Sequence, residues 1–408
     1  MSERHDSSPS VSAESPGTAD AAAVADRGIA SGGSPTVLDP EAADVVELTE
    51  RIIACASVSG EEAALADAVE AALAGLEVLD LHRDGDTLIA RTDTGAAERV
   101  VLAGHLDTVP LPSGAGSRGT VPPQWEGETL YGRGAVDMKG GVAVQLKLAA
   151  EIAAQVRGLA AGASLDREVT WVFYDHEEVA SHLSGLGRVM RRVPELLTGD
   201  FAVLLEPTDG VVEGGCNGTC RIRATIRGTA AHSGRSWMGR NAIHRAAGVL
   251  AALEAYQSRT VEVDGLAYRE GMNAVDIAGG VAGNVIPDVC TLEINHRFAP
   301  DTTEEQAHER IRALLRDAGV DDEQTEVTDT SAAARPGLDH PVARAFVEAV
   351  GGEPKPKYGW TDVARFSALG VPAVNFGPGD PLLCHTDDEH VSATALRACH
   401  AALSRWLG

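Results

Sequence analysis

Positive charge, and lysine above all, is scarce in this chain. The 34 basic residues face 60 acidic ones in 408 residues, and the formal net charge is −26. All but four of the basic residues are arginine; the lysines are Lys139, Lys147, Lys355 and Lys357. Nucleic acids and anionic membranes attract proteins through positive charge. The charge balance therefore excludes both as principal partners.

Paired cysteines and long apolar runs are also lacking. The six cysteines are scattered and none forms a C-x-x-C pair, which argues against a thiolate zinc finger. No run of about 18 apolar residues is present that could cross a membrane. The N-terminal segment MSERHDSSPS has no apolar signal region. We therefore expect a protein of the reducing cytoplasm.

Aromatic residues make up only 4% of the chain, so aliphatic side chains must fill the core. Residues 1–40 are rich in Ser, Ala, Gly, Pro and Asp, which predicts a disordered tail. Over residues 41–217, segments with helical spacing alternate with short apolar runs, and a Gly/Pro-rich stretch at 110–128 is expected to be a loop. This pattern predicts an α/β catalytic domain with a mostly parallel sheet and helices on both faces.

The pattern changes over residues 218–329. Alternating runs such as TCRIRATIRG and one helix on either side of a strand pair indicate an inserted α+β domain with the order β-α-β-β-α. Helix–strand alternation resumes over residues 330–408. We therefore expect the chain to leave the first domain, build the second and return.

Polar residues suited to metal chemistry follow the predicted strands. His105 and Asp107 end one apolar strand at i, i+2 spacing, which places them on one side of it. Glu177 and Glu178 follow the buried strand EVTWVFY, where adjacent carboxylates are costly unless a cation is present. His176 suggests an H-E-x-x-H motif, but residue 180 is Ala.

Three more candidates lie in comparable positions. Asp137 precedes a helix, where an N-cap is the simplest role, and its Gly-rich surroundings lack the spacing of a nucleotide-binding loop. Glu206 follows another apolar strand, and His385 lies in a loop after a later one. Open α/β sheets bind ligands at the carboxyl ends of their strands. Two His and three carboxylates there would suit two zinc-like ions that share one carboxylate.

The motifs GHLDTV, GRGAVDMKGG, EE, EP and a late His follow one another in this order. In this they resemble the dinuclear-zinc aminoacylase and glutamate-carboxypeptidase family of amidohydrolases, over nearly the whole chain after residue 40. The resemblance implies two divalent metal ions per chain, zinc first, with cobalt or manganese as alternatives. His105 and Glu206 would bind one ion and Glu178 and His385 the other. Asp137 would bridge them, followed by a cis peptide bond.

The resemblance also implies three catalytic side chains. Asp107 would orient His105, and Glu177 would be the general base. His232, in the segment AHSG, matches a His that reaches across a dimer and stabilises the oxyanion in the partner's active site. Without the resemblance, His232 would be read as a surface loop residue. A homodimer through residues 218–329 is implied.

Asn284 and Arg297 match family positions that hold substrate carboxylates, and Thr361 is a third expected substrate contact. Between Gly214 and Leu253 there are six arginines and no Asp or Glu, a local charge of +6 in an acidic chain. The resemblance therefore implies a small dicarboxylate-type amide as substrate, and the local positive charge agrees with an anion. Related N-acyl amino acids and peptide C-termini stay open as alternatives. A non-catalytic member of the family is disfavoured because no ligand is missing.

Overall fold

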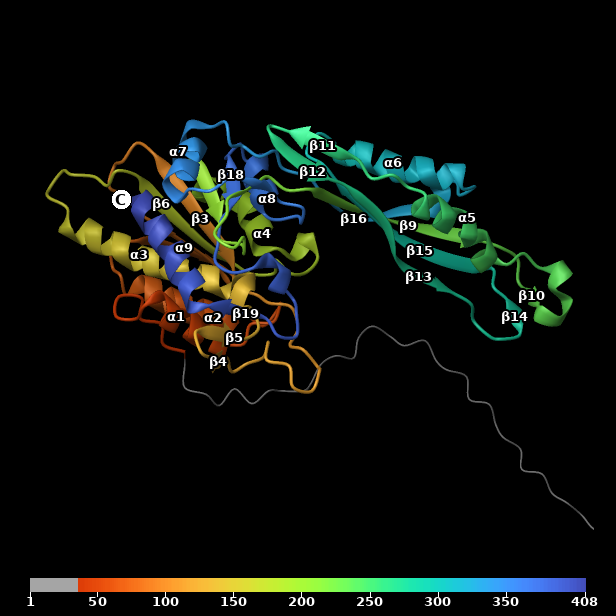
Figure 1. Ribbon diagram of the computed structural model, residues 1–408, viewed down its shortest axis with the longest axis horizontal. Helices are drawn as coiled ribbons and strands as arrows, with labels where there is room; N and C mark the ends of the chain where they lie inside the picture. The colour runs from red at the N-terminus through yellow and green to blue at the C-terminus, as the bar shows by residue number, and fades with distance from the viewer. Residues whose placement is uncertain (1–35) are drawn as a thin grey trace, which may run out of the picture. The chain divides into compact units, whose positions relative to one another are not determined.

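The computed structural model of the protein describes residues 36–408 (Figure 1). Most of the predicted tail, residues 1–35, lies outside the described residues. Residues 36–40 lie inside them, and Leu38 is buried in the core, so the packed part of the chain begins before residue 41. Residues 36–408 pack as one unit, and the domain boundaries expected at 217/218 and 329/330 stay predictions.

An eight-stranded mixed sheet organises the part of the chain that carries the metal-site motifs. In spatial order its strands are β1 (Asp80–Asp84), β2 (Thr87–Arg91), β6 (Glu168–Tyr174), β3 (Arg99–His105), β7 (Phe201–Leu204), β18 (Ala373–Asn375), β8 (Glu213–Gly214) and β17 (Lys355–Pro356). The four central strands β6, β3, β7 and β18 pair in parallel, while β1, β2 and β8 run antiparallel to their inner neighbours. The carboxyl ends of the four central strands therefore lie at the same edge of the sheet, as expected for a mostly parallel α/β sheet.

Side chains alternate along each strand, so a strand that is apolar throughout places apolar side chains on both faces of the sheet. Helices cover both faces. On β3, Val100 and Leu102 belong to one core cluster and Val101 and Ala103 to the other. The first cluster includes α1 (Val45–Ala54), α2 (Ala63–Ala74), α3 (Gly140–Gly158), α7 (Pro341–Val350) and α9 (Ala393–Leu407). The second includes α4 (Gly185–Arg192) and α8 (Val363–Ala368). The two helical layers of the prediction are confirmed.

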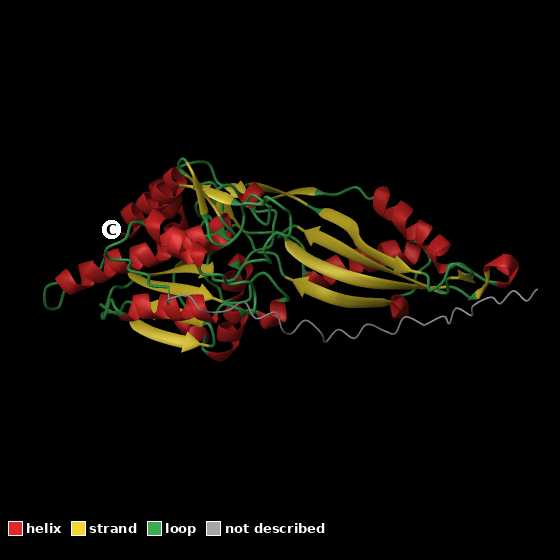
Figure 2. Cartoon of the chain, turned by 90° about the horizontal axis from the view of Figure 1, so that it is seen from below, coloured by secondary structure: helices red, strands yellow, loops and turns green. Residues whose placement is uncertain are grey.

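A second, four-stranded antiparallel sheet is built from residues 218–331. Its spatial order is β13 (Gly271–Gly279), β15 (Val289–Phe298), β9 (Gly218–Arg227) and β16 (Thr325–Ser331). The helices α5 (Ala242–Glu254) and α6 (Glu304–Asp317) share a core with its buried face. Figure 2 shows these long strands apart from those of the central sheet. On β9, Ile222 and Ala224 are buried while Arg221 and Arg223 are exposed, which explains the alternating sequence.

The structure adds strands that the sequence did not predict. The stretch 110–128 is not all loop, because β4 (Gln124–Glu126) pairs with β5 (Thr129–Tyr131), which pairs with β19 (His390–Ser392). The order β-α-β-β-α is incomplete, because β16 closes the four-stranded sheet. Two small pairs are also added: β10 (Ala231–His232) with β14 (Val285–Ile286), and β11 (Thr260–Val263) with β12 (Leu266–Arg269). Short helical turns are η2 (Ser181–Leu183), η3 (Pro194–Leu197), η4 (Ser233–Met238), η5 (Asp322–Gln324) and η6 (Pro381–Leu383).

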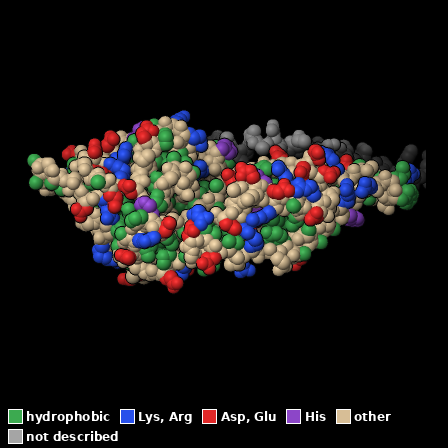
Figure 3. All heavy atoms as spheres, turned by 90° about the horizontal axis from the view of Figure 1, so that it is seen from above, with side chains coloured by type: hydrophobic (Ala, Val, Ile, Leu, Met, Phe, Trp, Pro, Cys, Tyr) green, Lys and Arg blue, Asp and Glu red, His purple; other side chains and the backbone are tan. Residues whose placement is uncertain are grey.

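None of the helices between residues 36 and 408 combines the length and hydrophobicity needed to cross a membrane. On the face seen in Figure 3, acidic and basic side chains are interspersed.

Candidate metal centre

The candidate metal ligands lie where the central strands end or in the loops that follow. His105 is the last residue of β3, Glu178 follows β6 and Glu206 follows β7. Asp137 lies in a short irregular turn, η1 (Ala135–Lys139), between β5 and α3, and His385 lies in a loop after β18. Parallel strands bring their carboxyl ends to one edge of the sheet, so residues far apart in sequence meet there.

The structure brings these five side chains together in two groups that share Asp137. His105 Nε2 lies 3.1 Å from Asp137 Oδ1 and 4.0 Å from Glu206 Oε1. His385 Nε2 lies 3.2 Å from Asp137 Oδ2 and 2.9 Å from Glu178 Oε1. In each group one donor atom per residue lies within 4.8 Å of the others. This is the grouping that two ions bridged by Asp137 would need.

The electrostatics of the cluster favour a cation. Burial raises the pKa of Glu206 to about 7, and the negative charge of Asp137 adds to the rise. Burial also raises the pKa of Glu177, with contributions from Glu206 and Glu178. So many buried carboxylates repel one another unless positive charge is supplied. Carboxylate oxygens and imidazole nitrogens are donors suited to zinc, cobalt or manganese.

The Asp107 carboxylate holds the backbone that carries the two adjacent glutamates. Its Oδ1 accepts a hydrogen bond from the Glu177 N–H at 2.9 Å, and its Oδ2 accepts from the Glu178 N–H at 3.0 Å and the Ser59 hydroxyl at 2.7 Å. His105 Nδ1 lies 3.0 Å from the Asp107 backbone oxygen and 3.5 Å from Oδ1. Asp107 thus lies against His105, but its carboxylate is engaged mainly with the Glu177–Glu178 turn and Ser59.

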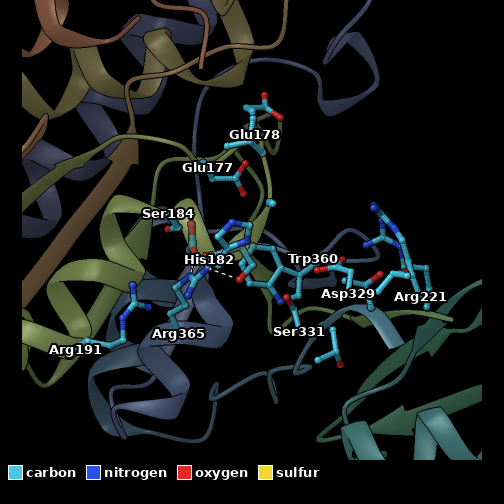
Figure 4. Close-up of a pocket in the computed structure, with 18 of the residues that line it drawn as sticks. Glu177, Glu178, His182, Ser184, Arg191, Arg221, Asp329, Ser331, Trp360 and Arg365 are labelled. Atoms are coloured by element: carbon cyan, nitrogen blue, oxygen red, sulfur yellow. Dashed lines mark hydrogen bonds and ion pairs between the residues drawn. The ribbon is translucent and has the colours of Figure 1, made fainter. Parts of the chain in front are cut away.

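Two neighbouring cavities adjoin the cluster. The larger, of about 880 Å³, is lined by Glu177, Glu178 and His385 and also by Arg221 and Arg297 of the four-stranded sheet (Figure 4). The smaller, of about 450 Å³, is lined by residues that include Asp137, Glu206, Lys357 and Thr361. Two of the three predicted substrate contacts, Arg297 and Thr361, therefore face space next to the candidate metal ligands.

His232 and Asn284 are placed elsewhere. His232 is exposed in β10, which pairs with β14, and the Ser233 N–H donates to the Asn284 backbone oxygen at 2.8 Å. Neither residue lines the two cavities next to the cluster. Within residues 36–408 of one chain, the structure does not bring them to the candidate metal ligands.

Sequence reasoning missed several polar residues around the cluster. Asp362 is buried, lines the larger cavity and accepts a hydrogen bond from Arg365 Nε. Asp362 directly follows Thr361, a predicted substrate contact, in the motif GWTD, and this position in the sequence could have indicated it. Glu389 is buried as well, although it follows two acidic residues and resembles a solvated charge run. For Glu389, nothing local in the sequence gave a signal.

The peptide bond between Asp137 and Met138 is cis, as the family resemblance implies. Among known proteins, the family model described as Peptidase family M20/M25/M40 matches residues 101–408. A Mycobacterium tuberculosis protein named succinyl-diaminopimelate desuccinylase DapE is 48% identical over 369 residues, covering 90% of this chain and 98% of its own. A Corynebacterium glutamicum protein named succinyl-diaminopimelate desuccinylase is 41% identical over 367 residues, covering 89% and 96%.

Among solved structures, the M20 family metallo-carboxypeptidase Sso-CP2 from Sulfolobus solfataricus aligns with a TM-score of 0.73 at 16% identity. The alignment covers 90% of this chain and 98% of that one, so the fold is shared. Fold, motif order and sequence identity agree. The chain belongs to peptidase family M20/M25/M40.

Proposed function

We propose that this chain hydrolyses the amide bond of N-succinyl-L,L-2,6-diaminopimelate, releasing succinate and L,L-diaminopimelate. One observation supports the proposal of hydrolysis: two possible metal-binding groups share Asp137. The first contains His105 and Glu206, and the second contains Glu178 and His385. The choice of substrate is supported by the names of the relatives at 48% and 41% identity. The segments GNVIPD and GWTDVARF, which resemble desuccinylases, add to that support.

Two divalent ions, zinc first and cobalt or manganese as alternatives, would be held by the two groups around Asp137. Bound there, such ions polarise a carbonyl and lower the pKa of water. Glu177 is the proposed general base. It lines the larger cavity beside Glu178, and its backbone is fixed by Asp107. Its burial among carboxylates favours taking up a proton, which it would then pass to the leaving amine.

Arg297 and Arg221 are the proposed partners of the substrate carboxylates. They lie on the neighbouring strands β15 and β9 and line the larger cavity. Burial lowers the pKa of Arg297, and the nearby Arg221 charge lowers it further. Within residues 36–408, neither guanidinium forms a salt bridge, although the Asp329 carboxylate lines the same cavity and its charge acts on Arg297. Two adjacent unpaired guanidinium groups suit a ligand with more than one carboxylate.

His232 would act in a homodimer. It lies with Asn284 at the β10–β14 pair, away from the cavities of its own chain. For His232 and Asn284 to contact substrate, both would have to lie beside the substrate cavity of a second copy of the chain. His232 would then stabilise the oxyanion and Asn284 a substrate carboxylate.

Substrate choice is tested by steady-state kinetics with the zinc-loaded protein. N-succinyl-L,L-diaminopimelate, N-acetyl-L-ornithine and a dipeptide are compared by kcat/KM. We expect the succinyl substrate to be preferred by about 100-fold or more, because a missing carboxylate leaves a guanidinium unpaired. Preference for N-acetyl-L-ornithine would instead indicate a deacetylase, with the same ligands serving another substrate.

A further inference from the structure

A buried carboxylate outside the candidate ligand set holds the turn that carries Asp137. Glu389 is 1% exposed. Its Oε1 accepts hydrogen bonds from the N–H groups of Val136 at 3.1 Å and Asp137 at 3.2 Å. Its Oε2 accepts from the Gly134 N–H at 3.1 Å and from Arg133 Nη1 at 2.8 Å. One side chain therefore fixes four donors between residues 133 and 137.

The same side chain ties this turn to the loop of the second histidine. Glu389 lies four positions after His385, and its backbone oxygen accepts from the Gly132 N–H at 3.1 Å. Arg133, itself 3% exposed, also donates from Nη1 to the Thr386 backbone oxygen at 3.2 Å. The Arg133–Glu389 pair thus links the two backbone segments whose side chains, Asp137 and His385, lie 3.2 Å apart.

A buried ion pair is an expensive way to stabilise a fold, because both charges lose their hydration. Pairs of this kind can nonetheless fix one arrangement of the backbone around them. Hydrogen-bonding partners behind metal ligands typically change metal affinity by about 10–100-fold when removed.

We propose that Glu389 and Arg133 are positioning residues that set the distance between Asp137 and His385, and through it the affinity for the ion held by Asp137, Glu178 and His385. This inference rests on the proposed two-ion function. Neither residue touches substrate in this proposal. Both act through the backbone of the two ligand-bearing segments.

The chain offers a matched control for a purely structural role. Glu168 is also buried, 3% exposed, and accepts hydrogen bonds from the N–H groups of Thr94 at 2.6 Å and Ala96 at 3.0 Å. It also accepts from the Thr92 hydroxyl. Glu168 lies at the start of β6, at the opposite end of that strand from Glu177 and Glu178. Glu168→Gln therefore makes the same isosteric change at a carboxylate of similar burial, away from the ligands.

The experiment is a zinc titration of the metal-free full-length protein by calorimetry, with the visible spectrum of the Co²⁺-loaded form and the Tm as further readouts. We expect Glu389→Gln to bind one ion about 10–100-fold more weakly and to change the Co²⁺ spectrum. Glu168→Gln should lower Tm but keep both affinities and the spectrum. If Glu389→Gln does not fold, Arg133→Lys takes its place. It retains the charge but loses the guanidinium fork, and it should bind the same ion more weakly.

Two outcomes would overturn the inference, and they are distinguishable. If the wild type binds two ions and Glu389→Gln or Arg133→Lys binds both unchanged, with only a lower Tm, the pair is structural. If the wild type binds fewer than two ions, the proposed function fails and the inference fails with it.

Discussion

Glu177 and Glu178 are adjacent in sequence, yet the proposed mechanism gives them different roles. The N–H groups of both donate to Asp107, but only Glu178 contacts His385 in a group that shares Asp137. We expect Glu177→Gln to retain both ions and lose kcat by about 10²–10⁴-fold, because the amide cannot accept a proton. Metal content and kcat are measured on the same sample.

Glu178→Gln is the matched comparison, and it should lose an ion as well as activity. A near-normal kcat in Glu177→Gln would show that another group is the base.

Glu206 should make the stability of the metal-free protein depend on pH. Burial raises its pKa to about 7, whereas the unfolded chain ionises near the ordinary value of 4.5. Protons are therefore bound more tightly in the folded state, and stability falls as pH rises from about 4.5 to about 7. Glu206→Gln removes this penalty and should raise the free energy of unfolding by about 3 kcal/mol near pH 8.

The sign should reverse with zinc, because the same substitution removes a ligand from the zinc-loaded protein and lowers its Tm. Urea unfolding at several pH values, with and without zinc, measures both effects. Equal changes in the two forms would contradict a ligand role for Glu206.

At the scale of elements, a side chain at Gly104 of β3 would meet the ends of two buried side chains, Met138 of η1 and Gln145 of α3. A Cβ there would lie 2.4 Å from Gln145 Nε2 and 2.8 Å from Met138 Cε. Met138 directly follows Asp137, so we expect Gly104→Ala to displace the Asp137 turn. The substitution should cost about 1–3 kcal/mol of stability and weaken zinc binding.

Gly158→Ala, at the last residue of α3, is the control for Gly104→Ala. A Cβ there has no neighbour within 4 Å, so stability and zinc affinity should stay near wild type. Unchanged zinc affinity in Gly104→Ala would show that this packing does not determine the position of Asp137. Denaturant unfolding and zinc titration measure the two quantities.

The elements that the sequence predicted are those whose patterns are local. Strands β3, β6 and β7 are apolar runs bounded by polar residues, and helices α3 and α9 carry long apolar spacings. Strand β16, TEVTDTS, is mostly polar and is held by pairing with β9, which no local pattern reveals. Helix α4 contains Gly185, where a Cβ would lie 2.2 Å from Asp175 Oδ1. Tertiary packing requires that glycine, although glycine is an unfavourable residue in a helix.

In the candidate site, too, residues within local sequence motifs could be proposed from the sequence, whereas residues held by distant contacts could not. Its five candidate metal ligands end strands or begin loops within recognisable motifs, which is why the sequence points to them. Glu389 and Arg133 pair with each other although they lie more than 250 positions apart, and the sequence gives no sign of that pairing.

At the scale of the whole molecule, the net charge of −26 concerns solubility more than substrate. The proposed substrate anion would meet Arg221 and Arg297 locally, because both line the cavity beside the candidate metal ligands. His232, the proposed oxyanion group, lies outside both cavities of its own chain.

The proposed dimer can be tested by complementation. A mixture of His232→Ala and Glu177→Gln chains forms heterodimers in which one site has both an intact base and an intact His232. We expect each variant alone to be nearly inactive and the re-equilibrated mixture to recover up to about a quarter of wild-type activity, from random pairing in a symmetric dimer. Full inactivity of the mixture, with mixed dimers verified by mass spectrometry, would place His232 outside the partner's site.

The most direct test of the proposed function is succinate release from N-succinyl-L,L-2,6-diaminopimelate by the metal-free full-length protein as zinc is added. We predict no release before zinc is added, and a rate that rises until two ions are bound per chain and falls again with a chelator. Release that is unaffected by the chelator, or no release with two ions bound, would contradict the proposed function.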